Sequence, residues 1–204
     1  MITSIFTMSA ELLAGAGPSA PAGRIIYQSC YGEIDYGYTA WFNFFFQLSY
    51  LKGFPIGLEP YFRISHTDHS QRFSETTYMG MPIGSKINES VVSYELGASR
   101  GVFNWSKIYL VAGAAITGNF GHLEWESYGS EAALKDTVIN RATPGLLGLA
   151  RLEFRENRRE YLSDRTVALV IGSSGRVNYM WLSQDDWPFQ KWFATLDIYV
   201  GVRW

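Results

Sequence analysis

Hydrophobic and polar residues alternate position by position over much of this chain. The clearest case runs from Tyr36 to Tyr50, where aromatic or aliphatic side chains fill every second position and mostly polar or small residues lie between them. A period of two is typical of a β-strand with one apolar face. Aromatic residues also favour strands and have weak helix propensity. The pattern therefore predicts a strand in this segment.

The same alternation recurs along the whole sequence. It predicts eight strands, at residues 2–16, 36–50, 56–65, 91–99, 108–117, 146–155, 163–172 and 193–204. A length of 204 residues fits a single domain, so we expect one barrel domain over residues 1–204. Within the third strand, Pro60 lacks the amide hydrogen of a ladder bond, which predicts a bulge or a missing bond there.

The connections between the predicted strands alternate between short and long. Residues 52–55, 101–106 and 156–160 are short connections, whereas residues 17–35, 66–90, 118–143 and 173–191 are long ones. Transmembrane β-barrels have short periplasmic turns and longer extracellular loops. The sequence therefore predicts an all-β fold, an eight-stranded antiparallel up-and-down transmembrane barrel with both termini at the short-turn end.

The first segment has a second interpretation. Ala20-Pro21-Ala22 has the small-residue form of a signal-peptide cleavage site, so residues 1–22 are either a strand or the remnant of a secretory signal. Arg24 is the first basic residue, and Glu11 interrupts the apolar stretch. These features and the even strand count favour the strand, in which case the signal has already been removed.

The polar face of the strands is rich in Glu and Arg and lacks Lys. We expect its charged side chains to form an interior network, made of Glu11, Glu59, Arg63, Glu95, Arg151, Glu153, Asp197 and Arg203. Glu and Arg pair well in a confined space, whereas a solvated surface uses Lys freely. This favours an outward apolar face that meets lipid over the soluble, lipocalin-like arrangement with the apolar face inside.

Composition and charge exclude several classes of protein. Charged residues make up 18% of the chain, below the roughly 25% of soluble domains, while hydrophobic residues make up 47%. A net charge of -2 without a basic cluster argues against a nucleic-acid partner. A lone Cys30 excludes an internal disulfide and a thiolate zinc finger, and we interpret it as a spectator residue. No uninterrupted apolar stretch is long enough for a transmembrane helix.

The end of the chain resembles the C-terminal signature of bacterial outer-membrane proteins. Val200, Val202 and the terminal Trp204 alternate with polar or small residues, and Trp stands where Phe is commoner. In that class this signature is read by the barrel-assembly machinery. The strand count and loop asymmetry are similar to small eight-stranded barrels such as the OmpA transmembrane domain, OmpX and OmpW-like proteins, although no motif selects one family. The resemblance implies an outer-membrane location in contact with lipid and lipopolysaccharide.

An eight-stranded barrel is just wide enough for side chains to fill its interior. Charged residues there need partners because desolvation penalises an isolated charge. We therefore expect the network to plug the barrel. The alternative is a narrow or gated conduit for ions or apolar solutes.

A possible active site lies at the long-loop end. His66, Asp68, Ser70 and His122 are candidate catalytic residues, with His as base and Ser as nucleophile. Outer-membrane lipid A acyltransferases and deacylases carry such residues at the outer rim, but the spacing here matches neither motif. We commit to no catalytic residue, and we expect no cofactor and no metal site.

The predicted outer loops also carry several large aromatic residues. Trp125, Trp181, Trp187, Phe189 and Trp192 form a candidate interaction patch. Such residues either anchor the barrel at the lipid headgroups or dock a partner. We expect a non-enzymatic structural or interaction barrel, with an accessory role in an envelope complex as the sharper form of this hypothesis.

Overall fold

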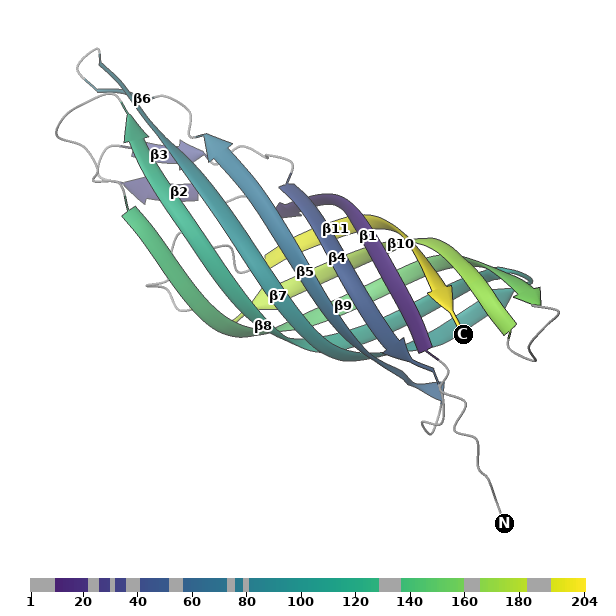
Figure 1. Cartoon of the computed structure of the whole chain (residues 1–204). Coiled ribbons are helices and arrows are strands. Elements are labelled where there is room, and N and C mark those ends of the chain that lie inside the picture. The colour runs from purple at the N-terminus through teal and green to yellow at the C-terminus, as the bar shows by residue number, and fades with distance from the viewer. Residues whose placement is uncertain are drawn as a thin grey trace.

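A computed structural model describes ten stretches of the chain, residues 10–21, 26–29, 32–35, 41–51, 57–72, 76–78, 81–128, 137–159, 166–182 and 192–204. Nearly all of them are strand (Figure 1). Eight strands form the barrel: β1 (Ala10–Pro21), β4 (Trp41–Tyr50), β5 (Glu59–Arg72), β7 (Met81–Trp105), β8 (Ile108–Tyr128), β9 (Thr137–Arg159), β10 (Thr166–Met180) and β11 (Trp192–Arg203).

These strands close into an antiparallel ring in which each strand pairs with its neighbour along the chain. The sheet runs β5-β4-β1-β11-β10-β9-β8-β7, and a further pairing of β5 with β7 completes the circle. At the seam, the backbone amides of Ala10 and Trp204 donate to each other's carbonyl oxygens at 2.8 and 2.9 Å. The predicted eight-stranded up-and-down barrel is confirmed.

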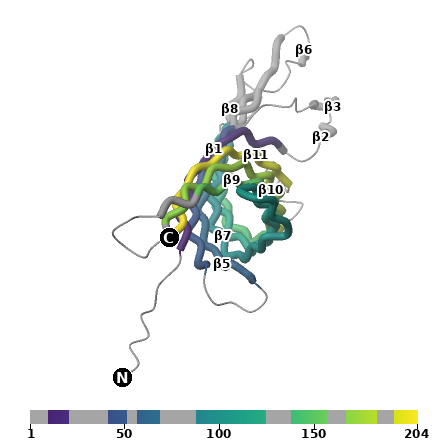
Figure 2. Tube along the Cα trace, turned by 90° about the vertical axis from the view of Figure 1, so that its right-hand side faces the viewer, coloured from purple at the N-terminus to yellow at the C-terminus, as the bar shows by residue number. Residues whose placement is uncertain are grey.

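The strands are strongly staggered around the ring. Directly opposed residues lead from Glu11 on β1 once around the barrel and return to β1 at Pro21, ten residues further along. Such a stagger requires the strands to tilt, typically by about 35–45° from the barrel axis. The tilt is evident in Figure 1, and the turned view in Figure 2 shows the strands curving around a common axis.

The two ends of the barrel differ. Ser106 and Lys107 alone join β7 to β8, and Ser106 takes a positive φ of 56°, as a tight two-residue hairpin requires. Both ends of the described ring, Ala10 and Trp204, lie at this short-turn end. The predicted asymmetry between short turns and long extensions is confirmed.

At the opposite end, however, the predicted strand boundaries are wrong. Most residues assigned to long loops are paired strand, because β5 continues to Arg72, β7 begins at Met81, β8 reaches Tyr128, β9 begins at Thr137 and β10 reaches Met180. β1 likewise continues to Pro21. On β5, β7, β8 and β9 the outward positions at the start of these segments are polar, at Asp68, Ser90, His122 and Asn140, so the alternation stops there although the hydrogen-bonded ladder continues.

Smaller elements accompany the ring. β2 (Ile26–Ser29) pairs with β3 (Gly32–Asp35), and β6 (Thr76–Tyr78) pairs with the start of β7. Pairing of β5 with β7 passes through Pro60 without a register shift, whereas a shift occurs between Gly101 and Phe103 of β7. The regular register excludes a bulge at Pro60 and leaves the other predicted alternative, a missing ladder bond, while β7 has a separate irregularity near the short turn. Residues 2–9, 36–40, 56 and 163–165 of the predicted strands lie outside the described residues.

The described part of the chain contains no helix that is long and apolar enough to span a bilayer.

Candidate functional site

The polarity of the ring is the reverse of that of a soluble barrel. Large apolar side chains cover its outside, among them Leu12, Phe46, Leu96, Ile116, Leu152, Ile171, Leu196 and Ile198. Its inside buries charged and polar residues, including Glu11, Arg63, Glu95, Arg151, Glu153 and Asp197 at 0–1% exposure. Exposing so large an apolar surface to water is unfavourable, and burying a charge without a partner costs free energy. The ring is thus built to lie in a bilayer.

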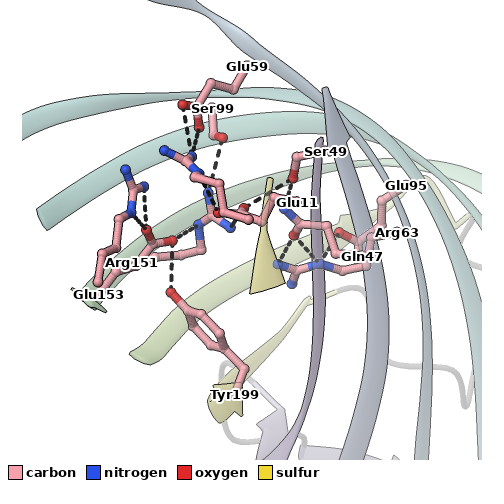
Figure 3. Close-up of polar contacts among 12 residues, drawn as sticks. Glu11, Gln47, Ser49, Glu59, Arg63, Glu95, Ser99, Arg151, Glu153 and Tyr199 are labelled. Atoms are coloured by element: carbon pink, nitrogen blue, oxygen red, sulfur yellow. Dashed lines mark hydrogen bonds and ion pairs between the residues drawn. The ribbon is translucent and has the colours of Figure 1, made fainter. Parts of the chain in front are cut away.

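A first ionic cluster fills the short-turn half of the interior (Figure 3). The Arg203 guanidinium donates to Glu11 at 3.1 Å and to both Glu59 oxygens at 3.0 Å. Arg151 lies between two carboxylates, 3.5 Å from Glu11 Oε1 and 3.3 Å from Glu153 Oε1. Each carboxylate in this half therefore has at least one arginine partner.

Glu153 gathers further donors. The Tyr199 hydroxyl donates to its Oε1 at 3.0 Å, and Arg155 Nε donates to its Oε2 at 2.8 Å. Arg151 also donates to the Ser99 hydroxyl at 3.3 Å (Figure 3). Charge-assisted bonds of this kind are about twice as strong as neutral ones. Four strands, β7, β9, β1 and β11, are thereby tied together across the barrel.

A second ionic cluster lies further from the short turns. Arg176 bridges two carboxylates, donating to Glu95 Oε1 at 2.8 Å and to Asp197 Oδ2 at 3.0 Å. Asp197 also accepts from the Asn43 amide at 2.8 Å. Arg63 lies 3.7 Å from Glu95, and its guanidinium lies 4.1 Å from the centroid of the Phe45 ring. Cation–π contact compensates part of the desolvation of this arginine.

Two neutral side chains join the clusters. Arg63 donates to Gln47 Oε1, with Nε at 2.9 Å and Nη2 at 2.5 Å. The Gln47 amide donates to the Ser49 hydroxyl at 2.8 Å, and that hydroxyl donates to Glu11 at 3.3 Å. Figure 3 shows this chain crossing from Arg63 to Glu11. The two ionic clusters are therefore joined into one polar network.

Nearer the long-extension end the interior holds mostly neutral polar groups, with the charged Glu89 buried further along β7. Asn119 accepts from the Ser93 hydroxyl at 2.7 Å and from the Asn178 amide at 3.0 Å, and it donates to Thr117 at 2.9 Å. Apolar side chains fill the space around the polar groups, in clusters of Leu13, Phe45, Val170 and Tyr199 and of Tyr61, Ala115, Leu147 and Leu149. A water-filled path along the axis would expose these side chains, yet all are buried.

Every residue of the predicted interior network points into the ring and takes part in the clusters described above. Sequence reasoning missed Arg176, Arg155 and Asn119 as members. Arg176 and Asn119 fell in segments assigned to loops, although both continue the inward parity of their strands, Arg176 from Ser174 and Asn119 from Thr117. Extending the period of two past the predicted strand ends would have found them.

Three of the candidate catalytic residues, His66, Asp68 and His122, lie on the outward face of the barrel. His66 Nε2 and Asp68 Oδ2 are 2.6 Å apart on β5, and the His66 ring stacks against Phe44 with centroids 5.1 Å apart. The backbone of Ser70 belongs to β5 and lies opposite that of Asn88 on β7. Among the described side chains, which do not include that of Ser70, no Ser hydroxyl is hydrogen-bonded to His66 or His122.

His122 belongs to a separate group on β8. One ring nitrogen lies 2.7 Å from Asn140 Oδ1 and the other 3.4 Å from Glu124 Oε1. The hydrogen bond to Asn140, followed by that to Glu124, raises the pKa of His122 above its ordinary value. With both nitrogens directed at acceptors, the ring suits a hydrogen-bonding role better than that of a general base. No group of three or more metal-ligating side chains occurs in the described part of the chain.

The proposed assembly signal faces outward, since Val200, Val202 and Trp204 are all exposed on β11 and at its end. The aromatic patch is only partly described. Trp181 and Trp192 are exposed, Trp125 is a backbone member of β8, and Trp187 and Phe189 lie outside the described residues. The Trp192 ring packs on Tyr179 with centroids 4.4 Å apart.

Comparisons with known proteins return small membrane barrels. Neisserial surface protein A is 15% identical over 95% of this chain and 95% of its own, with a TM-score of 0.47. Ail of Yersinia pestis, in complex with the heparin analogue sucrose octasulfate, is 13% identical over 97% and 99%, also with a TM-score of 0.47. The translocator domain of the autotransporter NalP from Neisseria meningitidis has a TM-score of 0.41 at 11% identity, over 96% and 88%.

No protein-family model matches the chain, and no curated protein matches it by sequence. At such low identities the structural likenesses carry no information about shared ligands or activity.

Proposed function

We propose that this chain is an integral outer-membrane barrel with a closed interior, which serves as a structural or interaction protein of the envelope. The observation that carries this proposal is the pairing of the buried charges. Arg63, Arg151 and Glu95 have ion-pair partners while exposing 0–1% of their surface. A pore would place such groups against water instead.

The apolar outside supports the location. Transmembrane β-strands need about 9–11 residues to cross a bilayer, and each of the eight ring strands has at least ten. Strands that cross membranes occur only in closed barrels, because an open edge leaves unpaired backbone groups in lipid. Outer-membrane lipid and lipopolysaccharide are the surroundings that we infer, and the barrel-assembly machinery is the inferred reader of Trp204.

The extended strands support an interaction role. β7, β8 and β9 have 25, 21 and 23 residues, about twice what a bilayer requires. Their excess length projects at the end opposite the short turns (Figure 1). A rigid paired sheet holds a docking surface in place better than an irregular loop does. We therefore propose that this end contacts a partner within an envelope complex.

Planar-bilayer recording tests the closed interior. The purified chain, with insertion verified by heat-modifiable mobility on a gel, is expected to show no stable conductance. The double variant Arg63→Ala, Glu95→Ala removes two interior side chains and keeps the net charge, so conductance steps are expected from it. Steady openings of the unmodified chain would contradict the proposal.

Purification from native membranes in mild detergent tests the partner. A stoichiometric companion is expected to co-purify, and a barrel that is recovered alone at native abundance would contradict the accessory role. An enzymatic role is tested separately by lipid A mass spectrometry of cells with the His66→Ala and His122→Ala variants, where we expect no change in acylation.

A further inference from the structure

The outward face of the barrel changes from apolar to hydrogen-bonding within two residues on adjacent strands. Phe44, His66, Val92, Phe120 and Ala142 lie side by side in the cross-strand register. The next outward row consists of Asp68, Ser90, His122 and Asn140, one residue from each of β5, β7, β8 and β9. We call these four residues the rim row.

The rim row is accessible from outside. The side chains of Asp68 and His122 are 59% and 47% exposed, and Asn140 is exposed as well. Phe120, directly below the row on β8, is exposed and stands perpendicular to the Tyr94 ring at 5.8 Å between centroids. The polar groups of the rim row and the apolar rings of Phe120 and Tyr94 thus lie on one continuous surface.

Several hydrogen-bonding atoms of this surface are left over after the internal contacts. His122 engages one oxygen of Asn140 and one oxygen of Glu124. The Asn140 amide nitrogen, the second Glu124 oxygen and the Ser90 hydroxyl make no hydrogen bond to the described residues. Donors and acceptors in this mixture suit a ligand whose groups both donate and accept, as hydroxyls do.

We propose that the rim row binds the uncharged, hydroxyl-rich headgroup of a membrane glycolipid, whose acyl chains lie against Val92, Phe120 and Tyr94. This inference rests on the proposed membrane location. Neighbouring strands are about 4.8 Å apart, so four adjacent strands offer a row roughly 14 Å long. A row of that length accommodates a short oligosaccharide lying across the strands.

The charges of the surface favour a sugar over a phosphate headgroup. Asp68 and Glu124 place two carboxylates at the row, and the row itself includes no Lys or Arg, although the exposed Arg141 beside it donates to the Asn140 backbone carbonyl oxygen at 3.2 Å. Acidic residues also outnumber basic ones over residues 66–90 and 118–143. Sugar hydroxyls donate to carboxylates and amide oxygens, whereas a phosphate diester has no donors for these acceptors and meets the negative charge of both carboxylates.

Native mass spectrometry of the full chain in nanodiscs tests the proposal. The nanodiscs are made of phosphatidylcholine with a minor fraction of either monogalactosyl diacylglycerol or phosphatidylglycerol. We expect preferential retention of the galactolipid. In the Ser90→Val, Asn140→Val double variant this preference should fall about tenfold, the loss of one or two net hydrogen bonds. Valine favours strands, so the ladder is preserved.

Ser173→Val is the matched control, because Ser173 is an outward serine of β10 away from the rim row, opposite Leu152 and Ile198. It should retain the galactolipid preference. Equal retention of both lipids, stronger retention of phosphatidylglycerol, or a double variant that behaves like the control would overturn the inference. Failure to insert into nanodiscs would instead contradict the membrane location, so the two failures are distinguishable.

Discussion

Along β8, two regions of one continuous strand differ in the residues that they turn outward and bury. In the ring, β8 turns Ile116 outward and buries Thr117 and Asn119 inside. Beyond the rim row, in the part that we call the extension (residues 69–72, 81–89, 123–128 and 137–139), the same strand turns Glu124 outward and buries Leu123 completely. The backbone ladder is the same in both regions.

The surroundings, and not the strand geometry, decide which residues a barrel strand turns outward. In lipid the outward face must be apolar and the inward face may hold charge if it is paired. In water the outward face accepts a charged residue such as Glu124, and an apolar residue such as Leu123 moves inside. We infer that this change along β8 marks the edge of the membrane.

The largest expected effect comes from breaking the interior network. Arg176→Ala leaves Glu95 and Asp197 without their shared partner and should lower the free energy of unfolding by about 3–5 kcal/mol. Urea unfolding in lipid vesicles, followed by tryptophan fluorescence, measures it. Arg100→Ala, at an exposed arginine, is the control and should change stability by less than about 0.5 kcal/mol. Equal effects of the two variants would mean that the buried pairing does not matter.

A charge placed on the outward face separates the two regions. Ile198→Arg should destabilise the ring by about 2–4 kcal/mol, the cost of Arg at a bilayer midplane. Val138→Arg in the extension should cost less than about 0.5 kcal/mol, since Val138 is equally outward but faces water. The same unfolding assay measures both, and a harmless Ile198→Arg would argue against lipid on that face.

A smaller effect is expected inside the ring from Tyr199→Phe. The variant removes the 3.0 Å hydrogen bond to Glu153 but keeps the ring that packs on Phe45. The cost should be about 1.5–3 kcal/mol, typical of a hydrogen bond to a charged group. Tyr109→Phe provides the comparison. Tyr109 also lies near the short turn, but its hydroxyl has no such hydrogen bond in the described structure, so this variant should unfold like the unmodified chain.

The smallest effect concerns pH at the rim row. Because hydrogen bonds to Asn140 and Glu124 raise the pKa of His122, the stability that its protonated form contributes is fully present below the ordinary pKa of about 6.5 and is lost as the pH rises through the folded-state pKa, where the ring gives up one of its two N–H donors. An NMR titration should place the His122 pKa above 6.5, and Asn140→Ala should lower it. An unshifted pKa in the unmodified chain would rule out these bonds in solution.

The sequence predicts the ring well because alternation is a local property. The inward parity of Glu11, Arg63 and Asp197 follows directly from the period of two. The sequence does not predict the extension, because the alternation already ends at the rim row. There Asp68, Ser90 and His122 stand at outward positions that are apolar on most of the ring. Pairing partners such as Arg176 with Glu95 depend on the ten-residue stagger around the ring, which is a property of closure that no single strand encodes.

Spin-label accessibility tests the central claim most directly, that one sheet passes from lipid to water at the rim row. With Cys30 replaced by Ser, single labels are placed at Ile198→Cys and Val138→Cys in lipid vesicles. The account predicts that oxygen, which concentrates in lipid, relaxes the label at 198, and that a water-soluble nickel chelate relaxes the label at 138. A label at 198 that is relaxed mainly by the nickel chelate would contradict the account.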